Sequence, residues 1–171
     1  MSKIRKSVSM LEEYIPGEQP NADAIKLNTN ENPYLPSPEV LDILREIDIS
    51  DLSLYPDPNC LELRKVIADL HQCSIDQIFV GNGSDEILAL AIRAYVERDS
   101  KVGYLAPSYS LYSVLTEIED IEHEVISLDD GFNFKIPEHL DCSLFLLANP
   151  NAPTGIFMDV ESINCFADNY K

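Results

Sequence analysis

A glycine-rich segment, 81–86, contains residues whose types and order suit the binding of an anion. Gly81 and Gly83 permit a tight turn and let the backbone approach a ligand closely. Ser84 is a natural N-cap for a following helix, whose first N–H groups and dipole favour phosphate. A plain turn with a serine cap explains the same residues and, on this segment alone, is the simpler interpretation. The segment has neither the GxGxxG pattern nor a Walker lysine, which disfavours nucleotide binding.

Two later segments offer an aromatic ring and side-chain amides for ligand binding. Tyr109 stands just past an expected strand, where its ring can stack on a flat heterocycle. Packing of Tyr109 and Tyr112 in the core is the alternative. The segment 149–155 contains two asparagines, two prolines and a glycine directly after an apolar run. Such a rigid polar loop can hold an amide in one orientation for a ligand, whereas an ordinary turn needs less specialised residues.

Alternating strands and helices are expected to position these three segments. Apolar runs predict strands at 77–80, 102–105, 123–128 and 144–148. Apolar periodicity predicts helices near 38–44, 63–70, 84–97, 109–118 and 160–170, with a brief turn or helix at 137–140. This alternation indicates an α/β fold with a mainly parallel sheet. Ligands of such sheets bind beyond the carboxyl ends of the strands, and each of the three segments follows a strand.

The chain is expected to divide into an arm and a main domain. Residues 1–38 read as an irregular N-terminal arm, because prolines and a glycine interrupt them too often for long elements. The remaining residues, 39–171, would form the main domain, and the chain as a whole is long enough for a hydrophobic core.

Composition excludes several classes of function. Among 171 residues, 30 are acidic and 12 basic, giving a net charge of −18. No basic face for nucleic acid is visible, and the charge opposes docking on anionic membranes. There is no apolar run long enough to span a membrane. The four cysteines and three histidines are scattered, so no metal site is expected. Without a secretory signal, the cysteines are expected to be free thiols in a cytoplasmic protein.

The three loops, taken together and in this order, resemble the cofactor loops of class I and II aminotransferases, which depend on pyridoxal 5'-phosphate. The motifs are Gly-Asn-Gly-Ser-Asp-Glu at 81–86, Pro-x-Tyr-x-x-Tyr at 107–112 and Asn-Pro-Asn-Ala-Pro-Thr-Gly at 149–155. Three earlier segments, 14–18, 27–33 and 55–57, resemble the histidinol-phosphate aminotransferase branch. The likeness extends from about residue 10 to the end of the chain.

The resemblance implies a fold and an activity. The fold would be of the aspartate-aminotransferase type, with the N-terminal arm followed by an incomplete large domain that binds pyridoxal phosphate. The activity would be histidinol-phosphate:2-oxoglutarate transamination in histidine biosynthesis, carried out by a homodimer when the protein is complete. The substrates would be a phosphorylated amino alcohol and glutamate or 2-oxoglutarate. Close alternatives are an aromatic amino-acid aminotransferase and a threonine-phosphate decarboxylase.

The resemblance also assigns residues to the cofactor. Backbone N–H groups around Gly83, Ser84 and Asp85 would hold its phosphate, and Tyr109 would stack on its pyridine ring. Tyr55 would reach across a dimer interface to the phosphate of the partner's cofactor.

The substrate side and the third loop are assigned in the same way. Tyr14, Asn30 and Glu31 would line the substrate side. In the family, an asparagine directly before Pro-Thr-Gly commonly donates a hydrogen bond to the cofactor's phenolic oxygen. Ala152 stands at that position here, so the adjacent Asn151 is expected to take the role if the loop shifts.

No catalytic residue is expected within the chain. The resemblance places the Schiff-base lysine and the carboxylate for the pyridine nitrogen downstream of Pro-Thr-Gly, beyond residue 171. No lysine of this chain occupies a matching motif. The chain alone is therefore expected to be a truncated and inactive part of an aminotransferase. A non-catalytic truncated remnant and a nucleotide-binding module are the alternatives from other classes.

Overall fold

Two compact units make up the protein, and each is described here by itself. The computed structural model describes residues 3–11, 17, 24–135, 137 and 139–170. The first unit, called the sheet unit, contains residues 3–11 and those from Gly81 onward; the second, called the helical unit, contains residue 17 and residues 24–80. The chain passes from the helical unit to the sheet unit between Val80 and Gly81. The predicted division into an N-terminal arm, 1–38, and a main domain, 39–171, stays a prediction.

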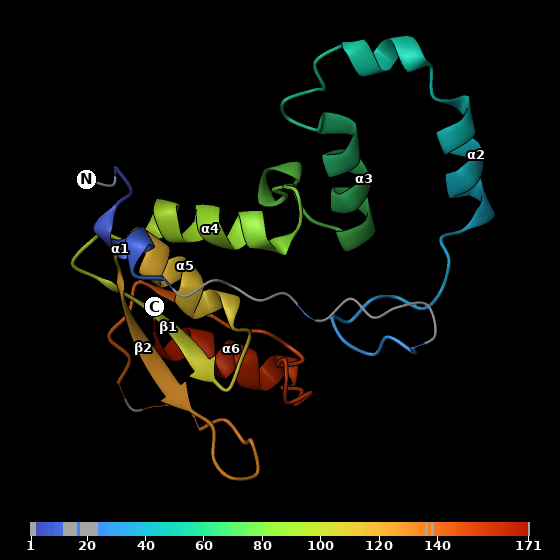
Figure 1. The fold of residues 1–171 in the computed structure, drawn as a ribbon. Coiled ribbons are helices and arrows are strands. Elements are labelled where there is room, and N and C mark those ends of the chain that lie inside the picture. The colour runs from blue at the N-terminus through green and yellow to red at the C-terminus, as the bar shows by residue number, and fades with distance from the viewer. Residues whose placement is uncertain (1–2, 12–16, 18–23, 136, 138, 171) are drawn as a thin grey trace. The chain divides into compact units, whose positions relative to one another are not determined.

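A parallel sheet forms the centre of the sheet unit (Figure 1). Its strands are β1 (Lys101–Ala106), β2 (Glu122–Ser127) and β3 (Leu144–Leu146), in the order β2-β1-β3. Val102 of β1 pairs with His123 on one side and with Leu144 on the other, and both pairings are parallel. The predicted α/β fold with a mainly parallel sheet is therefore confirmed.

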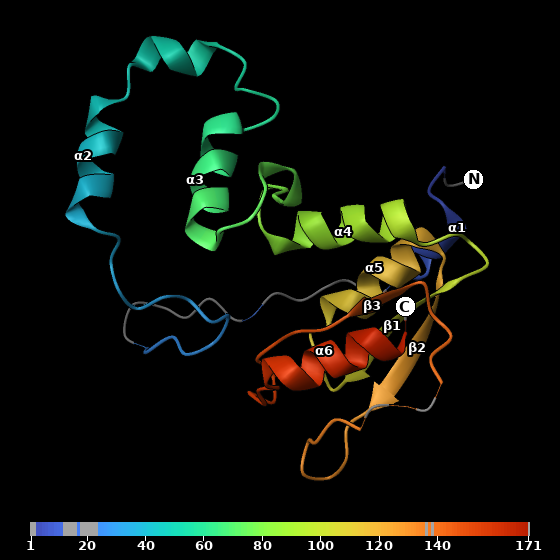
Figure 2. The same cartoon turned by 180° about the vertical axis from the view of Figure 1, so that it is seen from behind.

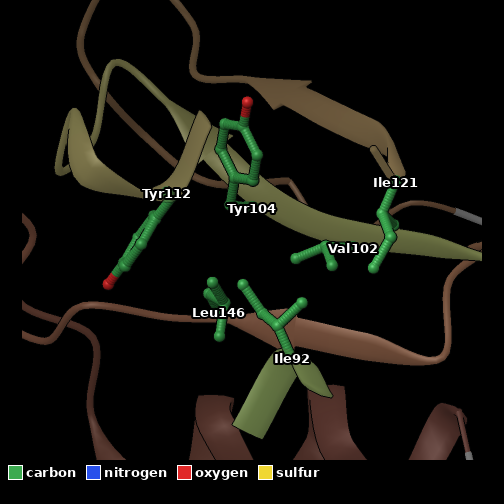
Figure 3. Packing of buried hydrophobic residues seen from close by; sticks show 6 residues of the cluster. All are labelled: Ile92, Val102, Tyr104, Tyr112, Ile121 and Leu146. Carbon is green, nitrogen blue, oxygen red and sulfur yellow. The ribbon is translucent and has the colours of Figure 1, made fainter. Parts of the chain in front are cut away.

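Helices cover both faces of this sheet. The helices α4 (Ser84–Tyr95) and α5 (Leu111–Glu119) lie on one face, and α6 (Val160–Asn169) lies on the other (Figures 1 and 2). The core between the sheet and the first two helices contains Ile92, Val102, Tyr104, Tyr112, Ile121 and Leu146 (Figure 3).

Close packing on the opposite face of the sheet explains one glycine. Phe166 of α6 packs against Phe145 of β3, with ring centroids 4.9 Å apart. A Cβ atom on Gly103 would lie 2.5 Å from Cδ2 of Phe145. Only glycine therefore fits at this point of β1 without a shift of the phenylalanine ring.

The described elements of the helical unit are α2 (Pro38–Glu46), α3 (Leu61–His71) and two 3₁₀ turns, η1 (Ile49–Ser53) and η2 (Ile75–Gln77). The guanidinium group of Arg64 donates hydrogen bonds to the carbonyl oxygens of Ile75 and Ile78, both at 2.8 Å. These bonds tie the chain after α3 to that helix. Ala68 is the one buried residue among those described in this unit.

Several predicted elements need correction. The strand predicted at 77–80 is absent: Arg64 binds the carbonyl of Ile78, and no described strand pairs with this segment. Ser84 is the first helical residue and not the N-cap; Gly83, with φ of 86°, is the N-cap. The strand predicted at 144–148 ends at Leu146, where its pairing with β1 also ends.

Three further predicted segments differ in part from the structure. Within the predicted irregular arm, Lys6–Ser9 forms one helical turn, α1. The helix predicted from 109 begins at Leu111, and residues 137, 139 and 140 are not helical. Among the described residues, no helix combines the length and apolarity needed to cross a membrane.

Candidate functional site

An open cleft of about 470 Å³ lies beyond the carboxyl ends of β1 and β3. Its lining residues are Ser84, Ile87, Leu88, Tyr109, Tyr112, Ala148 and Ala152. All three loops singled out in the sequence contribute to it: Ser84 from the first, Tyr109 and Tyr112 from the second, and Ala152 from the third. A larger hollow of about 580 Å³ lies beside α1 and α5, but it contains no residue of these loops. The smaller cleft is therefore the candidate site.

Gly83 leaves the first turn of α4 open to a ligand. Its φ of 86° lies in the region that favours glycine, and a Cβ atom there would meet nothing within 4 Å. No side chain caps the helix. The carboxylate of Glu86 instead accepts a hydrogen bond from the Asn82 N–H at 2.5 Å and steadies the loop. The first N–H groups of α4 can therefore bind an anion.

Tyr109 links the second loop to the first. Its hydroxyl donates a hydrogen bond to Oδ1 of Asp85 at 3.2 Å, and the Ser84 hydroxyl donates to the same oxygen at 3.4 Å. The ring of Tyr109 packs edge-on against Tyr112, with centroids 5.7 Å apart and an interplanar angle of 84°. The ring that was predicted to stack on a heterocycle therefore borders the cleft, next to the anion-binding turn.

Asn151 connects the second and third loops instead of lining the cleft. Its side chain is 4% exposed. Oδ1 accepts a hydrogen bond from the Ser108 hydroxyl at 2.6 Å, while Nδ2 donates to the Pro107 carbonyl and the Thr154 hydroxyl, both at 2.9 Å. A side-chain amide has two hydrogens, and both are used. Asn151 therefore has no free amide hydrogen for the predicted contact with a cofactor, and Ala152 lines the cleft in its place.

The other predicted site residues do not belong to the sheet unit. Tyr55 is exposed, Asn30 has a left-handed backbone with φ of 51°, and Glu31 forms an ion pair with Lys26. These three belong to the helical unit, so their predicted roles at the site stay predictions. Tyr14 lies outside the described residues.

The sequence analysis missed the apolar wall of the cleft. Ile87 and Leu88 stand three and four residues after Ser84 on α4, a spacing that places all three on one helix face. That spacing was the signal available in the sequence. None of the lining residues carries a charge. Burial raises the pKa of the Tyr112 phenol above its ordinary value, so Tyr112 stays protonated at neutral pH.

Solved structures share this fold. The histidinol-phosphate aminotransferase of Sinorhizobium meliloti, in complex with pyridoxal 5'-phosphate, superimposes with a TM-score of 0.68 at 23% identity, over 80% of this chain and 38% of that one. The histidinol-phosphate aminotransferase of Clostridium acetobutylicum gives a TM-score of 0.61 at 27% identity, over 73% of this chain and 37% of that one. The fold is therefore that of aminotransferases.

Sequence comparison identifies the family. The family model for aminotransferase class I and II matches residues 22–171, and the chain belongs to this family. The histidinol-phosphate aminotransferase of Brachyspira hyodysenteriae is 45% identical over 99% of the chain, and that of Clostridium beijerinckii is 42% identical over 100%. The chain spans about half the length of these curated relatives, 49% in both cases. The resemblance seen in the sequence is confirmed.

Proposed function

We propose that the protein is a pyridoxal-phosphate-dependent aminotransferase that acts on histidinol phosphate and 2-oxoglutarate in histidine biosynthesis. The convergence of three loops on one cleft at the carboxyl ends of parallel strands carries this proposal. Membership of the aminotransferase family supports the reaction type. The choice of substrate rests on the curated relatives, which carry the name histidinol-phosphate aminotransferase.

The residues of the cleft fit this cofactor. The uncapped first turn of α4 suits its phosphate, because Gly83 leaves open space in front of the N–H groups. Tyr109 borders the same space and offers a ring for stacking. Ile87 and Ala148 provide apolar walls for a flat heterocycle. Pyridoxal phosphate combines a phosphate with a flat heterocycle, and the cleft offers a surface for each.

In this proposal, the residues of the cleft bind and orient the cofactor. When bound, pyridoxal phosphate supplies the electron-withdrawing ring that transamination requires. Asp85 holds the Tyr109 hydroxyl and thereby fixes the ring beside the phosphate turn. The lining residues include neither a lysine nor a carboxylate. They therefore hold the cofactor in place and do not themselves move protons.

We also propose a cytoplasmic homodimer. Exposed apolar side chains on α2, among them Ile43 and Leu44, and the exposed Tyr55 of the same unit support an interface. All four cysteines are free thiols, which supports a reducing compartment.

Cofactor binding and turnover test the proposal on the protein at its natural length. Pyridoxal phosphate is titrated and followed by its absorbance, and glutamate formation is measured with histidinol phosphate and 2-oxoglutarate. We expect saturable binding together with turnover. Saturable binding with turnover only on aromatic amino acids would exclude histidinol phosphate as the substrate, and absence of binding would exclude the aminotransferase itself.

A bulky side chain at the phosphate turn tests the assigned site. Ser84→Trp places an indole at the mouth of the cleft. We expect pyridoxal phosphate affinity to fall about tenfold or more, which corresponds to the loss of at least one charge-assisted hydrogen bond. Ser127→Trp is the matched control, because Ser127 is exposed at the end of β2 and does not line the cleft. Equal affinity in both variants would place the phosphate elsewhere.

A further inference from the structure

Tyr112 belongs at once to the hydrophobic core and to the cleft. The residue is 5% exposed, and its ring packs against Tyr104 and Tyr109 with centroid distances of 5.8 and 5.7 Å. Figure 3 shows that its hydroxyl points away from the other five side chains of the core cluster. Tyr112 also lines the cleft beside Ser84 and Tyr109. The ring is therefore fixed by packing while the polar end is left for another role.

The hydroxyl of Tyr112 differs from the other hydroxyls of the cleft. Three lining residues have side-chain hydrogen-bonding groups: Ser84, Tyr109 and Tyr112. Ser84 and Tyr109 both donate to Asp85. Within the described part of the chain, the Tyr112 hydroxyl makes no hydrogen bond, yet no fully enclosed side-chain oxygen or nitrogen there lacks a partner. The hydroxyl of Tyr112 is therefore reached from the cleft.

The third loop does not supply a competing donor. Ala152, which lines the cleft, has no polar side-chain atom, and both amide hydrogens of Asn151 are bound within the loops. Among the described lining residues, Tyr112 alone has a hydroxyl that makes no hydrogen bond within the protein, so this hydroxyl is the side-chain donor available to a polar atom of a ligand.

We infer that the Tyr112 hydroxyl donates a hydrogen bond to a polar atom of the heterocyclic ring bound in the cleft, which makes Tyr112 a ligand-contacting residue. This inference rests on the proposed function, which identifies the ring as that of pyridoxal phosphate. The packing of Tyr112 against Tyr104 and Tyr109 means that the donor is held in place before the ligand arrives. The contact concerns the ring, since the phosphate is assigned to the turn at Gly83.

Tyr112→Phe removes the hydroxyl and keeps the ring that packs in the core. The matched control is Tyr104→Phe: Tyr104 is 7% exposed and its hydroxyl also has no partner among the described residues, but it does not line the cleft. Both variants and the parent are prepared at natural length. Dissociation constants are measured for pyridoxal phosphate, by absorbance, and for inorganic phosphate, by equilibrium dialysis.

We expect Tyr112→Phe to weaken pyridoxal phosphate about threefold to tenfold, as loss of one hydrogen bond does, and to leave inorganic phosphate unchanged. Tyr104→Phe should change neither constant. Unchanged pyridoxal phosphate affinity in Tyr112→Phe would overturn the inference, and so would equal weakening of both ligands, which indicates a purely structural role. A parent protein that binds inorganic phosphate but not pyridoxal phosphate would instead refute the proposed function and, with it, this contact.

Discussion

The two units of the protein differ in what their helices do with apolar side chains. In the sheet unit, α4 and α5 bury Ile92 and Tyr112 against the strands. In the helical unit, α2 has no buried residue, and Ile43 and Leu44 on it are exposed. Both sets of helices show the amphipathic pattern that predicts a buried face, but among the described residues of its unit α2 has no partner that buries this face.

The same difference applies to the predicted site residues of the two units. The residues of the cleft lie on loops that a buried sheet holds in place and that hydrogen bonds join, as between Asn151 and Ser108. Tyr55, Asn30 and Glu31 lie on exposed segments of the helical unit. The sheet unit thus contains a formed part of a site, whereas the predicted residues of the helical unit need a further surface to define their positions.

The largest expected effect comes from truncating an isoleucine in each unit. Ile92→Ala removes a side chain that is 0% exposed in the core of the sheet unit, and we expect a loss of about 2–5 kcal/mol in the free energy of unfolding. Ile43 is 64% exposed in α2, so Ile43→Ala should change this free energy by no more than about 0.5 kcal/mol at concentrations where the protein is monomeric, and by more where the proposed homodimer covers that face. Urea denaturation of both variants at natural length measures the two values.

The Ile43 variant decides whether the contrast holds in solution. A cost for Ile43→Ala close to that for Ile92→Ala would show that the exposed face of α2 is covered in the protein as it exists. Concentration dependence of that cost would then identify the cover as a second copy.

A second, intermediate effect is expected for the asparagine that joins the loops. Asn151→Ala leaves the Ser108 hydroxyl, the Pro107 carbonyl and the Thr154 hydroxyl without their shared partner. We expect a loss of about 1–3 kcal/mol in the free energy of unfolding, because buried groups become unsatisfied. Asn149→Ala is the matched control: Asn149 is exposed and its two bonds go to the backbone of Met158, which water can replace.

Pyridoxal phosphate affinity measured on the same two variants sharpens this prediction. If Asn151 holds Tyr109 and Ala152 in place, its loss should weaken binding more than the loss of Asn149 does. If Asn151→Ala and Asn149→Ala changed stability and affinity equally, Asn151 would have no special role in positioning the cleft residues.

Much of the sheet unit could be predicted from sequence, for a physical reason. Three of the four expected strands lie close to their predicted positions, because each pairs with a neighbouring strand of the same unit. The strand expected at 77–80 did not form: its Ile78 carbonyl accepts a hydrogen bond from Arg64, and no described strand pairs with the segment. Such a contact leaves no periodic mark in the sequence.

The site could be predicted in part. Glycine and serine directly before and at the start of a helix indicate an anion-binding turn, since their effect is local, and Gly83 does leave that turn open. The orientation of Asn151 could not be predicted from the sequence. Hydrogen bonds with Ser108 and Thr154 hold its side chain between the loops, whereas the adjacent Ala152 lines the cleft. The place of Tyr112 in the cleft was not predicted: the sequence offered only core packing for it, whereas a long side chain with a polar tip can border both core and cleft.

The smallest expected effect concerns two aspartates that cap helices, one in each unit. Asp159 accepts a hydrogen bond from the Ser162 N–H at 2.7 Å at the start of α6, and Asp48 accepts one from the Ser50 N–H at 2.8 Å at the start of η1. These backbone hydrogen bonds hold the pKa of each carboxyl below its ordinary value. A carboxyl whose pKa is lower in the folded state contributes its full stabilisation at pH values above its unfolded pKa of about 3.9. This contribution is lost as the pH falls through the folded-state pKa.

Replacement by asparagine keeps the cap and removes the titration. The stability advantage of the parent over Asp159→Asn should therefore be constant above about pH 5 and shrink below about pH 4, as measured by denaturation of the sheet unit across that range. Asp48→Asn should leave the same transition unchanged, since its cap belongs to the helical unit. If Asp48→Asn instead shifted that transition to the same extent, the two units would unfold as one cooperative body, and the contrast between them would concern burial alone.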